Sequence, residues 1–311
     1  MAVGELYGVG QVQFTGVSPL TLSQIQSTRL SPGIRNILLA GAGMVDPSFA
    51  AAEIIAPSAS ISSTEIATIL TAIGIAGVPF GSGLTYTGAD VYLTQFDEGG
   101  TRKTGSNHGK LASIKGIAVP RSITATQGGG PAVLNMDLVF VSTDGAVAPL
   151  IYSASAALPS AAVASEGFVL GPININGTSL PGIQSFTFDF GLGITLLSGD
   201  GEAHPTFAAI QSRGPSIRFS ATKSTALTTI TMLGTLQGAT DSVCYLRKLT
   251  EGGTRVANAT AQHISFTVDE GRIEPDDSSY DMGGSFQSYV ITPTYDGTNA
   301  IVVISAATAI S

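Results

Sequence analysis

Residues Tyr92–Arg102 read YLTQFDEGGTR, and residues Tyr245–Arg255 read YLRKLTEGGTR. Seven of these eleven positions are identical at a constant offset of 153 residues. A second pair of similar segments lies upstream: Pro47–Ser58 reads PSFAAAEIIAPS, and Pro205–Ser216 reads PTFAAIQSRGPS. Their prolines, phenylalanine, Ala-Ala pair and final serine coincide at an offset of 158. Similar blocks that recur in the same order predict an internal duplication.

The correspondence continues downstream with small changes of offset. The matching blocks are Gly116 and Pro120 with Gly271 and Pro275, Asp144-Gly145 with Asp296-Gly297, and SASAAL (Ser153–Leu158) with SAATAI (Ser305–Ile310). Each copy is the size of a domain, so the chain is expected to be a tandem pair and not a short-period solenoid. We predict a first unit at residues 32–165 and a second at residues 166–311.

Residues 1–31 precede the first unit and have no evident counterpart of equal length before the second. The segment QVQFTGV (Gln11–Val17) alternates polar and apolar side chains, as an edge strand does. Two interpretations stay open: a terminal strand of the first unit, or an arm that reaches a neighbouring subunit.

Each copy contains the same series of predicted elements: a β-rich section, the Pro-(Ser/Thr)-Phe-Ala-Ala block, a strand, a short helix, and then further strands. In the first copy, Ser62 and Glu65 have the spacing of a capping box. Four apolar side chains then fall on one helical face: Ile66, Ile69, Leu70 and Ile73. The helix pattern is weaker in the second copy, where Leu227, Ile230 and Leu233 are separated by threonines.

The Glu-Gly-Gly motifs are expected to form hairpin turns after a strand. The following strands are predicted over LASIKGI (Leu111–Ile117) and HISFTVDEG (His263–Gly271), and two more close each copy, giving about seven strands per copy. The order shows no strand–helix alternation. The predicted fold is therefore mainly β, with two tandem antiparallel β-sandwich or barrel domains, each flanked by one short α-helix.

The composition limits the functions that the chain could have. Charged residues make up 12% of its 311 residues, the formal net charge is −8, and 38 residues are glycine. So few charges suggest that much of the surface faces other protein. An acidic chain without a basic cluster is not expected to bind nucleic acid specifically.

Three further sequence features bear on localisation. The longest apolar stretch, Ile66–Phe80, is short and interrupted, so no membrane segment is expected. The N-terminal residues lack the pattern of a secretory signal. With Cys244 as the single cysteine, no intrachain disulfide framework is expected. The simplest expectation is assembly in a cytoplasm.

No catalytic motif is found: HExxH, CxxC, P-loop and GxSxG patterns are absent from the sequence. Aligned on the repeat, His108 and His263 fall two positions apart and so predict no shared role, while His204 stands before Pro205. We therefore expect no enzyme activity, no cofactor and no metal.

Candidate self-assembly contacts come from the repeated turns and from a glycine-rich loop that is longer in the first copy. They are Phe80, Tyr86, Gly99, Gly100, Arg102, Gly252, Gly253 and Arg255. The longer loop is either a neutral insertion or a contact loop. A second set, Glu274, Asp276, Asp277 and Asp281, is interpreted as a solvated acidic loop or an acidic channel wall. A cation site is the alternative, although the spacing matches no EF-hand loop.

The strand order, the flanking helix, the duplication and the segment SFTFDFGLGITLLSGDGEAHPTFAAI (Ser185–Ile210) together resemble the tail tube (major tail) proteins of long-tailed bacteriophages, in the variant with two tube domains per chain. The resemblance implies a structural virion protein of the phage tail. It implies trimeric, pseudo-hexameric rings that stack into a tube, contact other tail proteins and conduct genomic DNA without binding it specifically.

Two other classes remain open from the sequence. A double jelly-roll major capsid protein also forms pseudo-hexamers from trimers, but it is expected to have eight strands per domain and no repeated helix. A tandem β-sandwich adhesin or carbohydrate-binding protein would carry exposed aromatic side chains, and tryptophan is absent.

Overall fold

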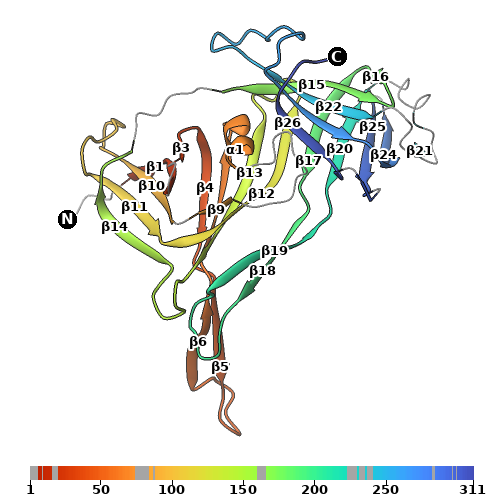
Figure 1. Ribbon diagram of the computed structural model, residues 1–311. Coiled ribbons are helices and arrows are strands. Elements are labelled where there is room, and N and C mark those ends of the chain that lie inside the picture. The colour runs from red at the N-terminus through yellow and green to blue at the C-terminus, as the bar shows by residue number, and fades with distance from the viewer. Residues whose placement is uncertain are drawn as a thin grey trace.

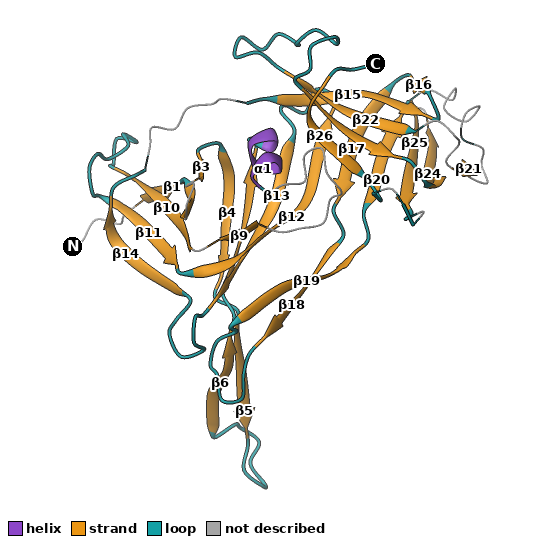
Figure 2. Ribbon diagram, in the orientation of Figure 1, coloured by secondary structure: helices purple, strands orange, loops and turns teal. Residues whose placement is uncertain are grey.

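The computed structural model describes residues 6–8, 10–15, 20–73, 84–86, 88–159, 166–222, 230, 235–236, 241–281, 284–295, 297–298 and 300–311. The fold is mainly β, with antiparallel sheets, as predicted (Figure 2). One helix, α1 (Ile66–Ala72), lies within these ranges. No described helix has the length and apolarity needed to span a membrane.

The first half of the chain contributes thirteen described strands (Figure 1). They are β1 (Leu6–Gly8), β2 (Val12–Thr15), β3 (Leu20–Leu22), β4 (Ile25–Ser31), β5 (Ile34–Leu39), β6 (Phe49–Ile55), β7 (Ser58–Ser63), β9 (Leu84–Tyr86), β10 (Gly88–Phe96), β11 (His108–Ser113), β12 (Lys115–Thr126), β13 (Val133–Val141) and β14 (Leu150–Ala156).

The second half contributes twelve. They are β15 (Phe168–Ile175), β16 (Thr178–Leu180), β17 (Ile183–Asp189), β18 (Leu192–Leu197), β19 (Phe207–Arg213), β20 (Ser216–Ala221), β21 (Thr235–Leu236), β22 (Ser242–Lys248), β23 (His263–Val268), β24 (Gly271–Asp281), β25 (Gly284–Pro293) and β26 (Val303–Thr308). The prediction of about seven strands per copy was too low, since nine described strands lie in residues 32–165 and twelve in residues 166–311.

The strand order is the same in the two halves. One sheet of the first half runs β14-β11-β10-β2-β3, and one sheet of the second runs β26-β23-β22-β15-β16. The other runs β12-β13-β7-β4 in the first half and β24-β25-β20-β17 in the second, with β9 on β12 and β21 on β24. The strands β2, β3 and β4 therefore correspond to β15, β16 and β17. Contrary to the expectation that residues 1–31 lack a counterpart of equal length, residues 12–31 correspond to residues 168–189, a segment of similar length.

Irregularities in the strand pairing recur at equivalent places. The register of β12 on β13 shifts between Pro120 and Ser122, and that of β24 on β25 shifts between Pro275 and Asp277. Proline lacks the N–H that a regular ladder uses, so within sheets it is found at edges and bulges. The prediction of a single strand over LASIKGI (Leu111–Ile117) was wrong, because this segment spans the end of β11 and the start of the long strand β12.

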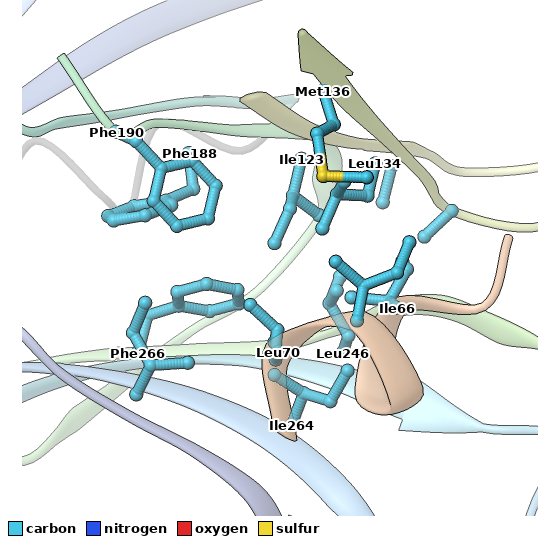
Figure 3. Close-up of a cluster of buried hydrophobic side chains, with 14 of the residues drawn as sticks. Ile66, Leu70, Ile123, Leu134, Met136, Phe188, Phe190, Leu246, Ile264 and Phe266 are labelled. Carbon is cyan, nitrogen blue, oxygen red and sulfur yellow. The ribbon is translucent and has the colours of Figure 1, made fainter. Parts of the chain in front are cut away.

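The two halves are joined through one continuous sheet. Ser122–Thr126 of β12 pairs with Ser185–Asp189 of β17, which produces a ten-stranded sheet. Side chains from both halves also pack in one hydrophobic cluster, in which α1 and β12 of the first half meet Phe188 and Phe266 of the second (Figure 3). The structure thus does not show two separately packed sandwiches.

The helix α1 begins differently from the prediction. Its apolar residues Ile66, Ile69 and Leu70 are buried, as expected, and so is Ile73 at its C-cap. Ser62, however, lies in β7 and its hydroxyl donates to the side chain of Asn135. A capping box is therefore absent.

Two glutamates hold the start of α1 instead. The carboxylate of Glu65 accepts the backbone N–H groups of Ser23 and Gln24, at 2.7 and 2.8 Å. The carboxylate of Glu166 accepts those of Ala67 and Thr68, both at 2.9 Å. Burial raises the pKa of Glu65, and the charge of Glu166 adds to this rise. The helix predicted for the second copy falls largely outside the described residues.

Candidate self-association surface

Two β-hairpins extend from the large sheet as separate two-stranded sheets: β5–β6 in the first half and β18–β19 in the second (Figure 1). Gly33 and Gly191 lie at the bends where the hairpins leave the sheet, with φ of +58° and +57°. A Cβ atom on either glycine would lie 1.9 Å from a backbone oxygen, of Ala56 or Gly214 respectively. Both bends therefore require glycine.

The hairpin β5–β6 is apolar and exposed. Every residue of β5 is exposed, and Val45 in the connecting turn is 97% exposed. The exposed large apolar side chains of this hairpin are Ile34, Ile37, Leu38, Leu39, Met44, Val45 and Phe49. An isolated hairpin is marginally stable in water, and a contiguous apolar patch of this kind marks an interaction surface.

The equivalent turn of β18–β19 is seated against the first half of the same chain. The N–H of Ile55, at the end of β6, donates to the carbonyl oxygen of Ala203 at 2.9 Å. The carbonyl oxygen of Gly145 accepts the N–H groups of Ala203 and His204, at 3.2 and 3.1 Å. The Nδ1 atom of His204 lies 3.1 Å from the carbonyl oxygen of Ile55.

Two further hydrogen bonds complete this seat. The N–H of Ser142 donates to the carbonyl oxygen of Pro205 at 2.7 Å, and the Nζ atom of Lys115 donates to that of Thr206 at 3.0 Å. The seat is thus formed by the end of β6, the start of β12 and the loop after β13.

Equivalent positions in the two halves differ in burial. Ile34 begins β5 and is 52% exposed, while its equivalent Leu192 begins β18 and is 4% exposed. Leu30 in β4 is 41% exposed, while its equivalent Phe188 in β17 is fully buried. All four side chains are apolar. Leu192 lies against the first half, where its carbonyl oxygen accepts a hydrogen bond from Arg121. Phe188 pairs with Ile123 of β12, and its ring also packs on Phe190 and Phe266 of its own half.

Equivalent strands of the ten-stranded sheet also differ in how many neighbours they pair with. Among the described strands, β4 pairs with β7 alone, whereas its equivalent β17 pairs with both β20 and β12. At the other end, residues 277–281 of β24 pair with β25, and the described part of the chain places no strand on their second edge. These two segments are the counterparts of the two that pair at the junction.

The repeated Glu-Gly-Gly turns, which were predicted as assembly contacts, lie away from the two hairpins. The Glu-Gly-Gly segments do form turns after β10 and β22, with Gly100 and Gly253 at φ of +75° and +76°. Isolated bridges pair Phe96 with Arg102 and Leu249 with Arg255. Gly99 and Gly252 in these turns are exposed. Figure 1 shows the ends of β10 and β22 far from the tip of β5–β6.

The other predicted contact residues are only partly described. Phe80 lies outside the described residues. Tyr86 ends the short strand β9, whose backbone pairs with β12.

The acidic residues belong to a strand and not to a loop. Glu274, Asp276, Asp277 and Asp281 all lie in β24. The carboxylate of Glu274 accepts from Arg272 at 2.8 Å, and that of Asp276 accepts from Arg218 at 3.1 Å. The Pro-Asp-Asp sequence suggested a loop because both residue types are rare in strands, but the proline lies at the bulge. No group of metal-binding side chains occurs among the residues with described positions.

The histidines correct another prediction. His108 and His263 occupy the same register position, opposite the last residues of β14 and β26, and both are buried. In each, Nδ1 accepts a backbone N–H at 3.1 Å, from Gln95 or Lys248. Burial lowers the pKa of His108. The second copy is two residues longer between Arg255 and His263 than the first is between Arg102 and His108, and this length difference concealed the equivalence. The shared role is structural.

Comparison with known proteins does not identify this chain. Its sequence matches no known family model, and a search of curated proteins finds no match either. The candidate self-association surface, formed by β4, β5–β6 and residues 277–281 of β24, was not singled out from the sequence. The only signal for it was the apolar character of IRNILLAGAGMV (Ile34–Val45), which also suits a buried strand.

Proposed function

We propose that this protein is a structural subunit that associates head to tail into closed rings of three chains, and that the rings stack into a tube. The proposal rests on the difference in burial between equivalent side chains: Leu30 is more exposed than Phe188, and Ile34 is more exposed than Leu192. Each position is apolar in both halves but is well buried only in the half that contacts a preceding half. A second copy would provide the first half with the same cover.

The junction within the chain supplies the geometry. Within the chain, Ser122–Thr126 of β12 and Ser185–Asp189 of β17 pair antiparallel. Between chains, the counterparts are Asp277–Asp281 of β24 and Ser27–Ser31 of β4. Main-chain hydrogen bonds do not require particular side chains, so the same pairing is available to these two edges. Unpaired edges of this kind otherwise favour uncontrolled association.

A head-to-tail interface of this type forms either a closed ring or an open helical filament. Since the two halves of one chain are already joined by the repeated interface, three chains would present six similar units around an axis. This pseudo-sixfold ring agrees with the resemblance to phage tail tube proteins.

The charge supports a conduit for DNA. The chain has 22 acidic and 14 basic residues, so a channel lined by it would repel phosphate groups and let DNA slide without sticking. In this role the protein is part of a virion tail, is assembled in a host cytoplasm, and contacts other tail proteins at the ends of the tube. It performs no catalysis.

The test is the state of association of the purified chain. Native mass spectrometry should find a species of three times 31.5 kDa, about 94 kDa. Negative-stain microscopy at high concentration should find six-lobed rings and hollow tubes. A chain that is folded by circular dichroism yet monomeric at all salt and protein concentrations would refute the proposal. Closed shells would favour a capsid protein, and glycan-binding monomers an adhesin.

A further inference from the structure

Within the described part of the chain, nothing outside the hairpin covers the tip of β5–β6, whereas the equivalent tip of β18–β19 is seated on the first half. The two tips have the same internal hydrogen bonds: Met44 N–H to Gly41 at 3.0 Å in the first, and Glu202 N–H to Gly199 at 3.3 Å in the second. Gly43 and Gly201 also share a positive φ, of +82° and +78°. The free tip therefore already has the conformation of the seated one, and docking would require little ordering.

We infer that the tip of β5–β6 docks on the second half of a neighbouring copy, at the positions equivalent to those that hold the tip of β18–β19. The inference rests on the head-to-tail assembly proposed above. Within the chain, Ala203 is seated on Ile55. Between copies, the equivalent pair is Val45 of one chain and Arg213 of the next.

The proposed seat has the elements of the known one. Arg213 ends β19 opposite Leu192, as Ile55 ends β6 opposite Ile34. Gly297 corresponds to Gly145 and shares its left-handed backbone, with φ of +91° against +77°.

The side chains of the two sites differ in a complementary way. Where the seated tip has His204, the free tip has Asp46, and where the known seat has Ile55, the proposed one has Arg213. Docking therefore brings a carboxylate beside a guanidinium. Val45, the most exposed apolar side chain among the residues described, would be covered at the same contact. Opposite charges at the rim of an apolar contact favour the correct partner and orientation.

The interface can be tested by disulfide cross-linking, because Cys244 is buried and is the single native cysteine. The test variant is V45C/R213C, and the matched control is I55C/A203C, which places cysteines at the equivalent contact within one chain. The hydrogen bond of 2.9 Å between the Ile55 N–H and the Ala203 carbonyl oxygen holds these two residues close together, and a disulfide joins Cα atoms about 4.4–6.8 Å apart. Each single-cysteine variant controls for random collisions.

After mild oxidation, V45C/R213C should give covalent dimers and trimers on a denaturing gel without reductant, in a ladder that ends at three chains. I55C/A203C should stay at the mass of one chain. If V45C/R213C forms rings but no cross-link, while I55C/A203C does form its disulfide, the docking site is wrong and the proposed function is unaffected. A ladder beyond three chains would also overturn it, because the contact would then lie outside a closed ring of three. If no rings form, the proposed function fails, and this inference with it.

A charge exchange tests the same contact without cysteines. D46R and R213D should each weaken ring formation, by about fivefold in the dissociation constant, and D46R/R213D should restore it. If the loss of binding free energy in D46R/R213D equalled the sum of the losses in the two single variants, the result would contradict the contact.

Discussion

Replacing Leu30 and Ile34 by lysine should weaken ring formation while leaving the chain folded. Fully burying a Leu or Ile side chain stabilises by about 1.5–3 kcal/mol. Leu30 is 41% exposed and Ile34 is 52% exposed, so covering the remainder would contribute about 0.6–1.2 and 0.8–1.6 kcal/mol. Together these amount to about 1.4–2.8 kcal/mol per interface, or about 10- to 100-fold in the dissociation constant.

Lysine suits this test because its alkyl stem still covers the sheet beneath, while its ammonium group resists burial in a neighbour. Lysine on an edge strand also opposes strand pairing. The dissociation constant of L30K/I34K should therefore be at least about 10- to 100-fold higher than that of the unsubstituted chain.

The matched control is I151K. Ile151 in β14 and its equivalent Val303 in β26 are both exposed, so this position lies outside the repeated junction. Sedimentation velocity across a concentration series gives the dissociation constant, and urea unfolding confirms that each variant remains folded. If L30K/I34K forms rings at the same concentration as the unsubstituted chain, the inference from equivalent positions is wrong.

Three further predictions concern the fold. Gly33→Ala should lower the free energy of unfolding by about 1–3 kcal/mol, because its Cβ would clash with the Ala56 oxygen; Gly43→Ala, with open space around its Cβ, should cost about 1 kcal/mol. Glu166→Gln should lower it by about 1–2 kcal/mol in urea titrations, since one carbonyl oxygen replaces two acceptors at the start of α1; an unchanged midpoint would contradict this cap. The lowered pKa of His108 favours folding above pH 6.5, and this contribution is lost as the pH falls through the folded-state pKa. His108→Asn keeps an acceptor without titrating, so its unfolding free energy should fall less between pH 7.5 and 5 than that of the unsubstituted chain.

The duplication and the class of fold were readable from the sequence. The YL–EGGTR and Pro-(Ser/Thr)-Phe-Ala-Ala segments have matching structures because identical turn residues and alternating apolar residues specify the same local geometry. The buried face of α1 was predicted for the same reason: Ile66, Ile69, Leu70 and Ile73 follow the helical period.

Other features were misread because local patterns are ambiguous. Pro275 and the acids beside it suggested a loop, but a bulge admits proline within β24. The equivalence of His108 and His263 was missed because an alignment by constant offset fails after an insertion. The strand pairing shows the equivalence, because His108 and His263 each lie opposite the last residue of the neighbouring strand, β14 or β26.

The sequence alone therefore sufficed for the repeat, the antiparallel β character and the helix face, since each is encoded in residues close together along the chain. The joining of two halves into one sheet depends on β12 and β17, whose paired residues are roughly 60 positions apart, and no local signal reports that pairing. The identity of an apolar residue also does not indicate which other part of the protein will bury it. Leu30 and Phe188 look alike in sequence, and only the folded chain leaves one exposed and the other buried.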